Sequence, residues 1–279
     1  MGSNSVLVVA TDSQRKALAT RIQKAGYATR FSELPDAMTE WDPLKAPGFL
    51  VVDVGIPSTD VEKLCRHVKL HETFNRISVV VIREESPHPP PGEHLRVEPD
   101  RYIQDGATHK DFRRVLRERR RVTAEREKAG VRFHLETLTP SDLTVLSEVA
   151  EILEPVLWHS GFPENTSQRV RYGVLEMGLN AMEWGNSLDS DRWVRFVFTI
   201  YGDRFTAKIA DEGPGFDTDA VEPMGNVPDP RIRKREREEV GKRFGGYGVS
   251  ICRKFMDEVE YNEAGNEVLL TKYLPGASG

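Results

Sequence analysis

Short apolar runs alternate with amphipathic stretches along the first half of the chain. Four of the apolar runs are typical of strands that a parallel sheet buries on both faces: 6–9, 49–52, 77–82 and 102–103. The stretches between them carry apolar residues at helical spacing and predict helices over 13–25 and 58–68, and from Lys110 onward. A repeat of this kind predicts a parallel sheet with helices on both faces.

The last of these helices marks the end of the first domain. Its apolar positions, Phe112, Val115 and Leu116, lie early in the helix. Beyond Leu116 charge dominates, with arginines at 117, 119, 120 and 121, which is typical of a solvated face. We therefore predict a solvated linker helix over 110–128 and a first domain over 1–128. Binding of nucleic acid by the arginines is the less favoured interpretation.

The second half has an α+β pattern and predicts a second domain over 131–274. An alternating strand at 131–135 precedes an amphipathic helix over 142–158, whose start is marked by Pro140 and Ser141. Asn165 is the predicted cap of a helix through Glu183, with Gln168 three residues on. The later elements are a hairpin, a helix and a strand pair, predicted over 193–201 with 204–210, over 248–256, and over 258–261 with 267–273.

Composition favours a soluble globular protein of two domains, because 38% of the 279 residues are hydrophobic and 30% are charged. The two cysteines, Cys65 and Cys252, form no metal or disulfide spacing, and we expect both to be buried. No signal peptide or apolar stretch of about 20 residues is present, so we expect a cytoplasmic protein without membrane contact. The net charge of −5 argues against direct binding of nucleic acid.

The helix that follows Asn165 carries two different stripes. One is apolar, with Val170, Val174, Met177 and Ala181 at helical spacing. The other is polar, with Glu176, Asn180 and Glu183 at positions i, i+4 and i+7. A carboxylate and an amide on a mostly buried helix cost free energy unless they have partners. The pattern fits a ligand site or a solvated face about equally well.

Two glycine-rich segments complete the candidate chemistry. Asp211, Gly213 and Gly215 follow a predicted strand, and glycines let a main chain approach a ligand closely. Gly246 and Gly248 stand directly before a predicted helix, whose free amides suit phosphate oxygens. Either segment alone is also typical of a plain turn.

In this order, Glu-x3-Asn, Asp-x-Gly-x-Gly and Gly-x-Gly resemble the Bergerat-type (GHKL) ATPase fold, and more closely the anti-sigma-factor serine/threonine kinase family. The string from Glu176 reads E-M-G-L-N-A-M-E-W-G-N, where the family runs E-x-x-x-N-A-x-E-H-G-N. The string from Gly246 reads G-Y-G-V-S-I-C-R-K-F-M-D-E-V-E-Y and matches the family's G-x-G segment and its closing D-E-V-x-Y. The resemblance covers roughly 131–274. It departs at Trp184, where the family usually has His.

The resemblance implies an α+β ATPase sandwich that binds ATP and Mg²⁺. It assigns Mg²⁺ binding to Asn180, whose amide oxygen suits this hard cation, and the general base to Glu176. It assigns the adenine amino group to Asp211. It assigns the base pocket to Gly213 and Gly215, and support of adenine through water to Thr271. The phosphates lie under a charged lid over 217–244, and the residues assigned to contact them are Lys242, Arg243, Gly246 and Gly248.

The family's activity implies a kinase that phosphorylates a serine on an anti-sigma-factor antagonist, a STAS-type domain. Sequestration of a sigma factor and a homodimer are implied as well. The alternative is a nucleotide-dependent protein-binding switch without kinase activity. A sensor histidine kinase is disfavoured, because the strand predicted from Val131 leaves no room for a helical pair bearing a phosphorylatable His.

The first half resembles a response-regulator receiver domain with a flavodoxin-like sheet. Asp53 ends a predicted strand at the position of a phosphoacceptor and is followed by Gly55, Ile56 and Pro57. Most of a receiver's other site residues are replaced: Ala10, Thr11 and Asp12 stand for the acidic pair, Arg83 and Glu84 for Thr or Ser, and Asp105 and Gly106 for Lys-Pro. Without the metal pair and lysine, transfer to Asp53 lacks charge neutralisation. We therefore favour a degenerate receiver that serves as an interaction or dimerisation module over an active phosphoacceptor.

Overall fold

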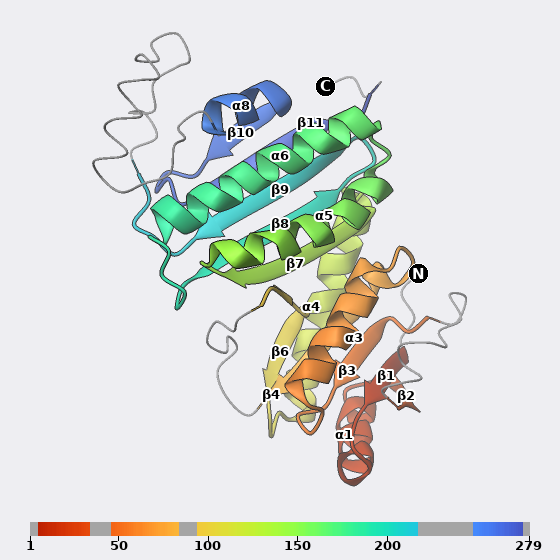
Figure 1. Ribbon diagram of the computed structural model, residues 1–279. Helices are drawn as coiled ribbons and strands as arrows, with labels where there is room; N and C mark the ends of the chain where they lie inside the picture. Colours follow the sequence, from red (N-terminus) through yellow and green to blue (C-terminus); the bar gives the residue numbers. More distant parts are fainter. Residues whose placement is uncertain (1–4, 34–45, 84–93, 217–247, 276–279) are drawn as a thin grey trace, which may run out of the picture. The chain divides into compact units, whose positions relative to one another are not determined.

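The computed structural model describes residues 5–33, 46–83, 94–216 and 248–275 (Figure 1). The chain forms two compact units. Unit 1 contains residues 1–90, 96–137 and 199–202, and unit 2 contains residues 91–95, 138–198 and 203–279. Residues 131–137 therefore group with unit 1, and the domain boundary near 129 stays a prediction.

Unit 1 is built on a five-stranded sheet of order β2-β1-β3-β4-β6. Its strands are β1 (Ser5–Val9), β2 (Ala28–Ser32), β3 (Phe49–Val52), β4 (Ser78–Arg83) and β6 (Arg101–Gln104). Every neighbouring pair in this sheet is parallel. This is the flavodoxin-like order of a doubly wound sheet, so the predicted fold of the first half is confirmed.

Helices cover both faces of the parallel sheet. The helices α1 (Asp12–Lys24) and α4 (His109–Lys128) share one apolar core with the strands, and α3 (Ser58–Leu70) buries Val61, Leu64 and Cys65. A short 3₁₀ turn, η2 (Phe74–Arg76), follows α3. The side chain and backbone of Thr108 exchange hydrogen bonds with Asp111 at the start of α4, a capping box that fixes where this helix begins.

The prediction that the charged part of α4 is solvated is wrong for Arg119. This side chain is only 10% exposed and forms an ion pair of 2.7 Å with Asp100. Arg126, two turns further along the same face of the helix, lies 3.6 Å from the same carboxylate. Arg119 and Arg126 therefore hold α4 to Asp100, whereas Arg117, Arg120 and Arg121 are exposed as predicted.

The second sheet has six strands in the order β10-β11-β9-β8-β7-β5. They are β5 (Arg96–Val97), β7 (Phe133–Pro140), β8 (Trp193–Ile200), β9 (Arg204–Asp211), β10 (Glu258–Tyr261) and β11 (Glu267–Tyr273). The pairs β10–β11 and β11–β9 are antiparallel. In unit 2 the helices α5 (Leu146–Ser160) and α6 (Glu164–Asn180) lie side by side across one face of this sheet, with α8 (Gly248–Phe255) packed against α6 (Figure 1).

Helix α6 begins two residues earlier than a cap at Asn165 would allow, so that prediction is wrong. Pro163 stands at the cap and makes no side-chain hydrogen bond, because a proline ring has no polar atom. Gln168 instead donates to the carboxylate of Glu164 at 2.9 Å. After Asn180 the helix continues as a π-helical turn, Ala181–Gly185.

Close packing holds α6 against its neighbours. A Cβ on Gly178 would lie 2.7 Å from the ring of Phe196 on β8, and one on Gly173 would lie 3.3 Å from the sulfur of Cys252 on α8. Both cysteines are buried, as expected. Within the described parts of the chain, no helix has the length and apolar character needed to cross a membrane.

Candidate functional site

Glu176 and Asn180 lie one turn apart on α6, and both are half-buried. The apolar stripe beside them is buried as predicted, including Val170, Val174 and Met177. The only hydrogen bond of the Asn180 side chain to a described residue is a long contact of 4.0 Å to the sulfur of Met177. No described residue donates to the carboxylate of Glu176. Two half-buried polar groups are thus left to bind something other than the described protein.

Asp211 stands at the end of β9, and both its carboxylate and its backbone N–H are hydrogen-bonded. Its Oδ1 accepts from the backbone N–H of Gly213 at 2.9 Å, and its own N–H donates to the carbonyl of Asn266 at 3.0 Å. A Cβ on Gly185 would overlap the carboxyl group of Asp211, so only glycine fits at position 185 in this arrangement. Burial raises the pKa of Asp211, and the bond from Gly213 partly opposes this rise.

The glycines after Asp211 are required by contacts between main chains. A Cβ on Gly213 would overlap the carbonyl oxygen of Gly185, and one on Gly215 would overlap that of Ala264. Gly215 also has φ +75°, a conformation that other residues rarely adopt. The Asp-x-Gly-x-Gly segment therefore forms a wall of main chain next to Asp211.

Thr271 does not join this group. In the sheet it lies opposite Thr206, and Thr206 precedes Asp211 by five residues, a separation of about 17 Å along an antiparallel strand. Asn266 is the β11-side residue that meets Asp211: its carbonyl accepts from Asp211 and its amide donates to the carbonyl of Gly213 at 3.4 Å. The structure thus places Asn266, and not Thr271, beside Asp211, and a role of Thr271 in binding adenine stays a prediction.

Three of the predicted phosphate contacts, Lys242, Arg243 and Gly246, lie outside the described residues, as does the lid over 217–244. Gly248 is described and begins α8, the helix expected there. Sequence reasoning assigned no role to Gly185, Asn186 or Asn266. Gly185 and Asn186 are the last two residues of the family-like string that starts at Glu176. Their place in that string is the feature of the sequence that could have indicated a role for them.

A family model described as a histidine kinase-like ATPase domain matches residues 139–272. Residues 139–272 form a histidine kinase-like ATPase domain. The serine-protein kinase RsbW of Bacillus subtilis is 26% identical over 144 residues, which cover 51% of this chain and 87% of that protein. RsbW of Listeria monocytogenes serovar 1/2a is 25% identical over 130 residues, covering 44% and 75% respectively. These similarities support a kinase-like role for the ATPase domain.

Among solved structures, the receiver domain of a sensor histidine kinase from Pseudomonas aeruginosa PAO1 aligns with 42% of this chain and 97% of its own, at 12% identity and a TM-score of 0.32. The strand order of unit 1 is itself the one found in receivers. The protein thus joins a receiver-like domain to a histidine kinase-like ATPase domain.

In the receiver-like domain, Thr11 is the residue that meets Asp53. Asp53 is buried at 2% exposure, and the hydroxyl of Thr11 donates to its Oδ2 at 3.4 Å. Asp12 is 90% exposed and forms an ion pair with Arg15 at 3.0 Å. The described residues contain no group of three His, Cys, Asp or Glu that could hold a metal ion. Among the described residues, the side chain that contacts the carboxylate of Asp53 is thus a hydroxyl, and Asp12 faces away into an exposed ion pair.

We expect that Asp53 does not accept a phosphoryl group stably. Treating the full-length protein with a small phosphodonor and Mg²⁺ should leave its intact mass unchanged, because no metal offsets the charge of the incoming phosphoryl group. Mass spectrometry of the parent and of Asp53→Ala measures this. A stoichiometric adduct on the parent that is absent from Asp53→Ala would contradict the prediction.

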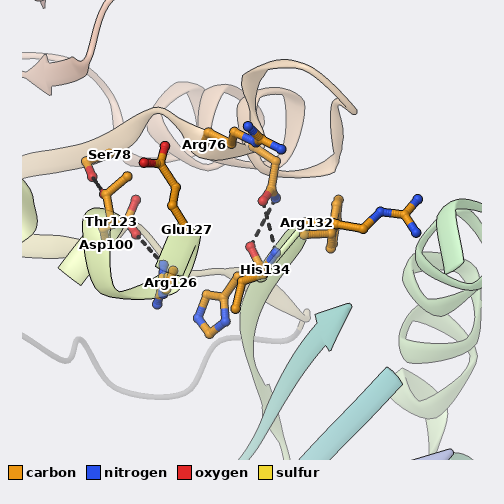
Figure 2. Close-up of a pocket in the computed structure, with 11 residues that line it drawn as sticks. Arg76, Ser78, Asp100, Thr123, Arg126, Glu127, Arg132 and His134 are labelled. Carbon is orange, nitrogen blue, oxygen red and sulfur yellow. Dashed lines mark hydrogen bonds and ion pairs between the residues drawn. The ribbon is translucent and has the colours of Figure 1, made fainter. Parts of the chain in front are cut away.

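Unit 1 also contains a buried charge cluster around Asp100. Lys69 donates to Asp100, and Arg119 pairs with the same carboxylate. Arg126 faces this carboxylate as well (Figure 2). Burial alone would raise the pKa of Asp100, but the charges of Lys69 and Arg119 outweigh it and hold this pKa at about 2. Burial lowers the pKa of nearby His134 to about 3, and Arg126 adds to the shift.

A small cavity of about 30 Å³ adjoins this cluster, lined by residues of η2, the start of β4, the end of α4 and the start of β7. Within it, the hydroxyls of Ser78 and Thr123 lie 3.4 Å apart (Figure 2). One water needs roughly 10–15 Å³ on this measure, so the cavity has room for about two waters. It is too small for a nucleotide and is a structural feature of unit 1.

Proposed function

We propose that the protein is an ATP-dependent serine/threonine kinase that phosphorylates a serine on an anti-sigma-factor antagonist of the STAS type. The observation that carries the proposal is the half-buried pair Glu176 and Asn180, whose polar groups have no good partner among the described residues. The similarity to two serine-protein kinases over most of their length supports the same reading.

The donor set fits a nucleotide with Mg²⁺. An amide oxygen such as that of Asn180 is a suitable ligand for this cation, which normally keeps several waters and phosphate oxygens around it. Mg²⁺ would neutralise charge on the phosphates. Glu176, one turn away, would take the proton of the incoming serine hydroxyl.

The adenine end of the proposed site is Asp211. Its carboxylate would accept a hydrogen bond from the exocyclic amine, and the main-chain wall of Gly213 and Gly215 would lie against the base. Lys242, Arg243, Gly246 and Gly248 would contact the phosphates from the lid side. Sequestration of a sigma factor and assembly as a homodimer belong to the same proposal, on the strength of the family resemblance.

A switch without kinase activity is the second candidate, and the substitution at Trp184 favours it. Trp184 is 42% exposed and stands beside Gly185, in the place where the kinase family usually has His. A change so close to Asp211 could leave nucleotide binding intact and remove transfer. The Glu176 and Asn180 variants separate the two candidates.

Replacing Asp211 by asparagine should weaken ATP binding by about 1–3 kcal/mol, the usual cost of leaving a buried polar group unpaired. Isothermal titration calorimetry of the full-length protein measures the effect. The matched control is Asp203→Asn, because Asp203 lies in an exposed turn and pairs only with its neighbour Arg204 at 3.0 Å. Equal ATP affinities for both variants would rule out Asp211 as the adenine acceptor.

A further inference from the structure

Asn186 is a fully buried amide that joins three other chain segments of unit 2. Its Nδ2 donates to the hydroxyl of Ser141 at 2.7 Å and to the carbonyl of Trp193 at 2.8 Å. Its Oδ1 accepts from the backbone N–H of Glu212 at 2.8 Å. An asparagine side chain offers two donors and one acceptor oxygen with two lone pairs, so three of its four bonding positions are filled here.

The partners of Asn186 are also bonded to one another. The carboxylate of Glu212 accepts from the N–H of Trp193 at 2.8 Å, and the backbone N–H and hydroxyl of Ser141 both donate to the carbonyl of Arg192 at 3.1 Å. The end of β7, the start of β8, the end of β9 and the π-helical turn therefore form one closed network. Asn186 bonds to one residue at each of the three strand ends.

The residues next to this network in the sequence are those of the proposed adenine site. Gly185 precedes Asn186 and packs against the carboxylate of Asp211, and Glu212 directly follows Asp211. The bond from Glu212 to Asn186 thus fixes the end of β9 against the end of α6. Any change in that bond should move the Asp211 carboxylate relative to Asn180, six residues before Asn186 on the chain.

The turn after Asn186 stores backbone strain. Ser187 and Leu188 both have φ 58°, a left-handed conformation that is unfavourable for a residue as bulky as leucine. The N–H of Leu188 donates to the carbonyl of Met182 at 2.8 Å and keeps the turn closed. A strained turn of this kind persists only when neighbouring contacts hold its backbone in place. The three hydrogen bonds of Asn186, the residue just before the turn, supply such contacts.

We propose that Asn186 is a positioning residue that sets the adenine selectivity of the site by holding the Asp211 carboxylate in place. The inference rests on the proposed function, in which Asp211 accepts from the adenine amine. Only glutamine carries the same amide, and it sets that amide one methylene further from the main chain. Aspartate would set an oxygen against the carbonyl of Trp193, and alanine would remove all three bonds.

The test compares ATP with inosine triphosphate, which carries an oxygen where adenine carries the amine. The dissociation constant of the parent should be about tenfold or more lower for ATP than for inosine triphosphate. A tenfold difference corresponds to roughly 1.4 kcal/mol, which is about the contribution of one hydrogen bond. Asn186→Ala should bring the ratio of the two dissociation constants close to one, mainly by weakening ATP binding. Ser141→Ala removes the two bonds of that hydroxyl, one from Asn186 and one to the carbonyl of Arg192, but leaves the bond from Glu212 to Asn186, so it should keep the preference.

Glu212→Ala gives a second variant that should fold, because its side chain is exposed and it loses only the bond from Trp193. It should reduce the ATP preference partway. If Asn186→Ala or Glu212→Ala lowers the melting temperature but keeps the full preference, Asn186 is merely structural and the inference is wrong. The assignment of Asp211 would instead be overturned if the parent showed no preference for ATP, or if Asp211→Asn left that preference unchanged.

Discussion

Replacing Glu176 by glutamine should slow phosphoryl transfer by a factor of roughly 10²–10⁴, the usual contribution of a general base. ATP·Mg²⁺ affinity should stay near that of the parent, because glutamine has the same shape and the proposed metal ligand, Asn180, is unchanged. The measurement is single-turnover transfer from labelled ATP to a STAS-type antagonist domain, together with calorimetry of nucleotide binding. Glu164→Gln is the control, since Glu164 lies at the exposed start of the same helix and bonds only to Gln168.

Asn180→Ala should lose Mg²⁺-dependent binding and transfer together, because it removes the proposed metal ligand. If Glu176 and Asn180 merely belong to a solvated helix face, binding and transfer should be unchanged in both variants. A switch without kinase activity would show no transfer even in the parent, and only Asn180→Ala would abolish its nucleotide-dependent binding to a partner. The two variants therefore distinguish the kinase from either alternative.

Asp100→Asn should lower the free energy of unfolding by about 3–5 kcal/mol, the cost of removing one partner from a buried ion pair. It would leave Lys69, Arg119 and Arg126 facing one another without the carboxylate that all three contact. Urea unfolding followed by circular dichroism measures the change.

A matched pair of arginines on α4 provides the control for this cluster. Arg119→Gln should be clearly destabilising, whereas Arg121→Gln should change stability by less than about 1 kcal/mol, because Arg121 is 74% exposed and pairs only with Glu125. If Asp100→Asn proves as mild as Arg121→Gln, the cluster does not stabilise unit 1.

The strands of unit 1 were predictable wherever both faces of a strand are buried. β1, β3 and β4 read as continuous apolar runs for that reason. β2 was missed, because it lies at the edge of the sheet and its residues Ala28–Ser32 are mostly exposed and polar. Its place is fixed by parallel pairing with β1, which local sequence does not reveal.

The burial of Arg119 could not be read from its charged neighbours. Its partner Asp100 lies nineteen residues earlier, in front of β6, and only the packing of α4 on the sheet brings the two together. A run of charge predicts solvation on average. It does not reveal which member of the run faces a buried carboxylate.

For the candidate site, sequence motifs indicated which segments would meet but not the strand register between them. The order of the three motifs indicates the ATPase fold, and the structure places Asp211 next to Gly185 from the first motif. The sequence places Thr271 on the closing strand but does not reveal how this strand pairs with its neighbour. The pairing of Glu267 with Ala210 brings Asn266 to Asp211 instead.

The wall beside Asp211 consists of main chain packed on main chain. Gly213 lies against the carbonyl of Gly185, Gly215 against that of Ala264, and Gly265 against that of Phe216, with no space for a Cβ at any of the three glycines. Because a substitution changes a side chain and not the main chain, it cannot alter such a surface in small steps. An inhibitor that binds this wall would therefore leave few single-residue routes to resistance, because each substitution that alters the wall also disturbs the strand end that carries Asp211.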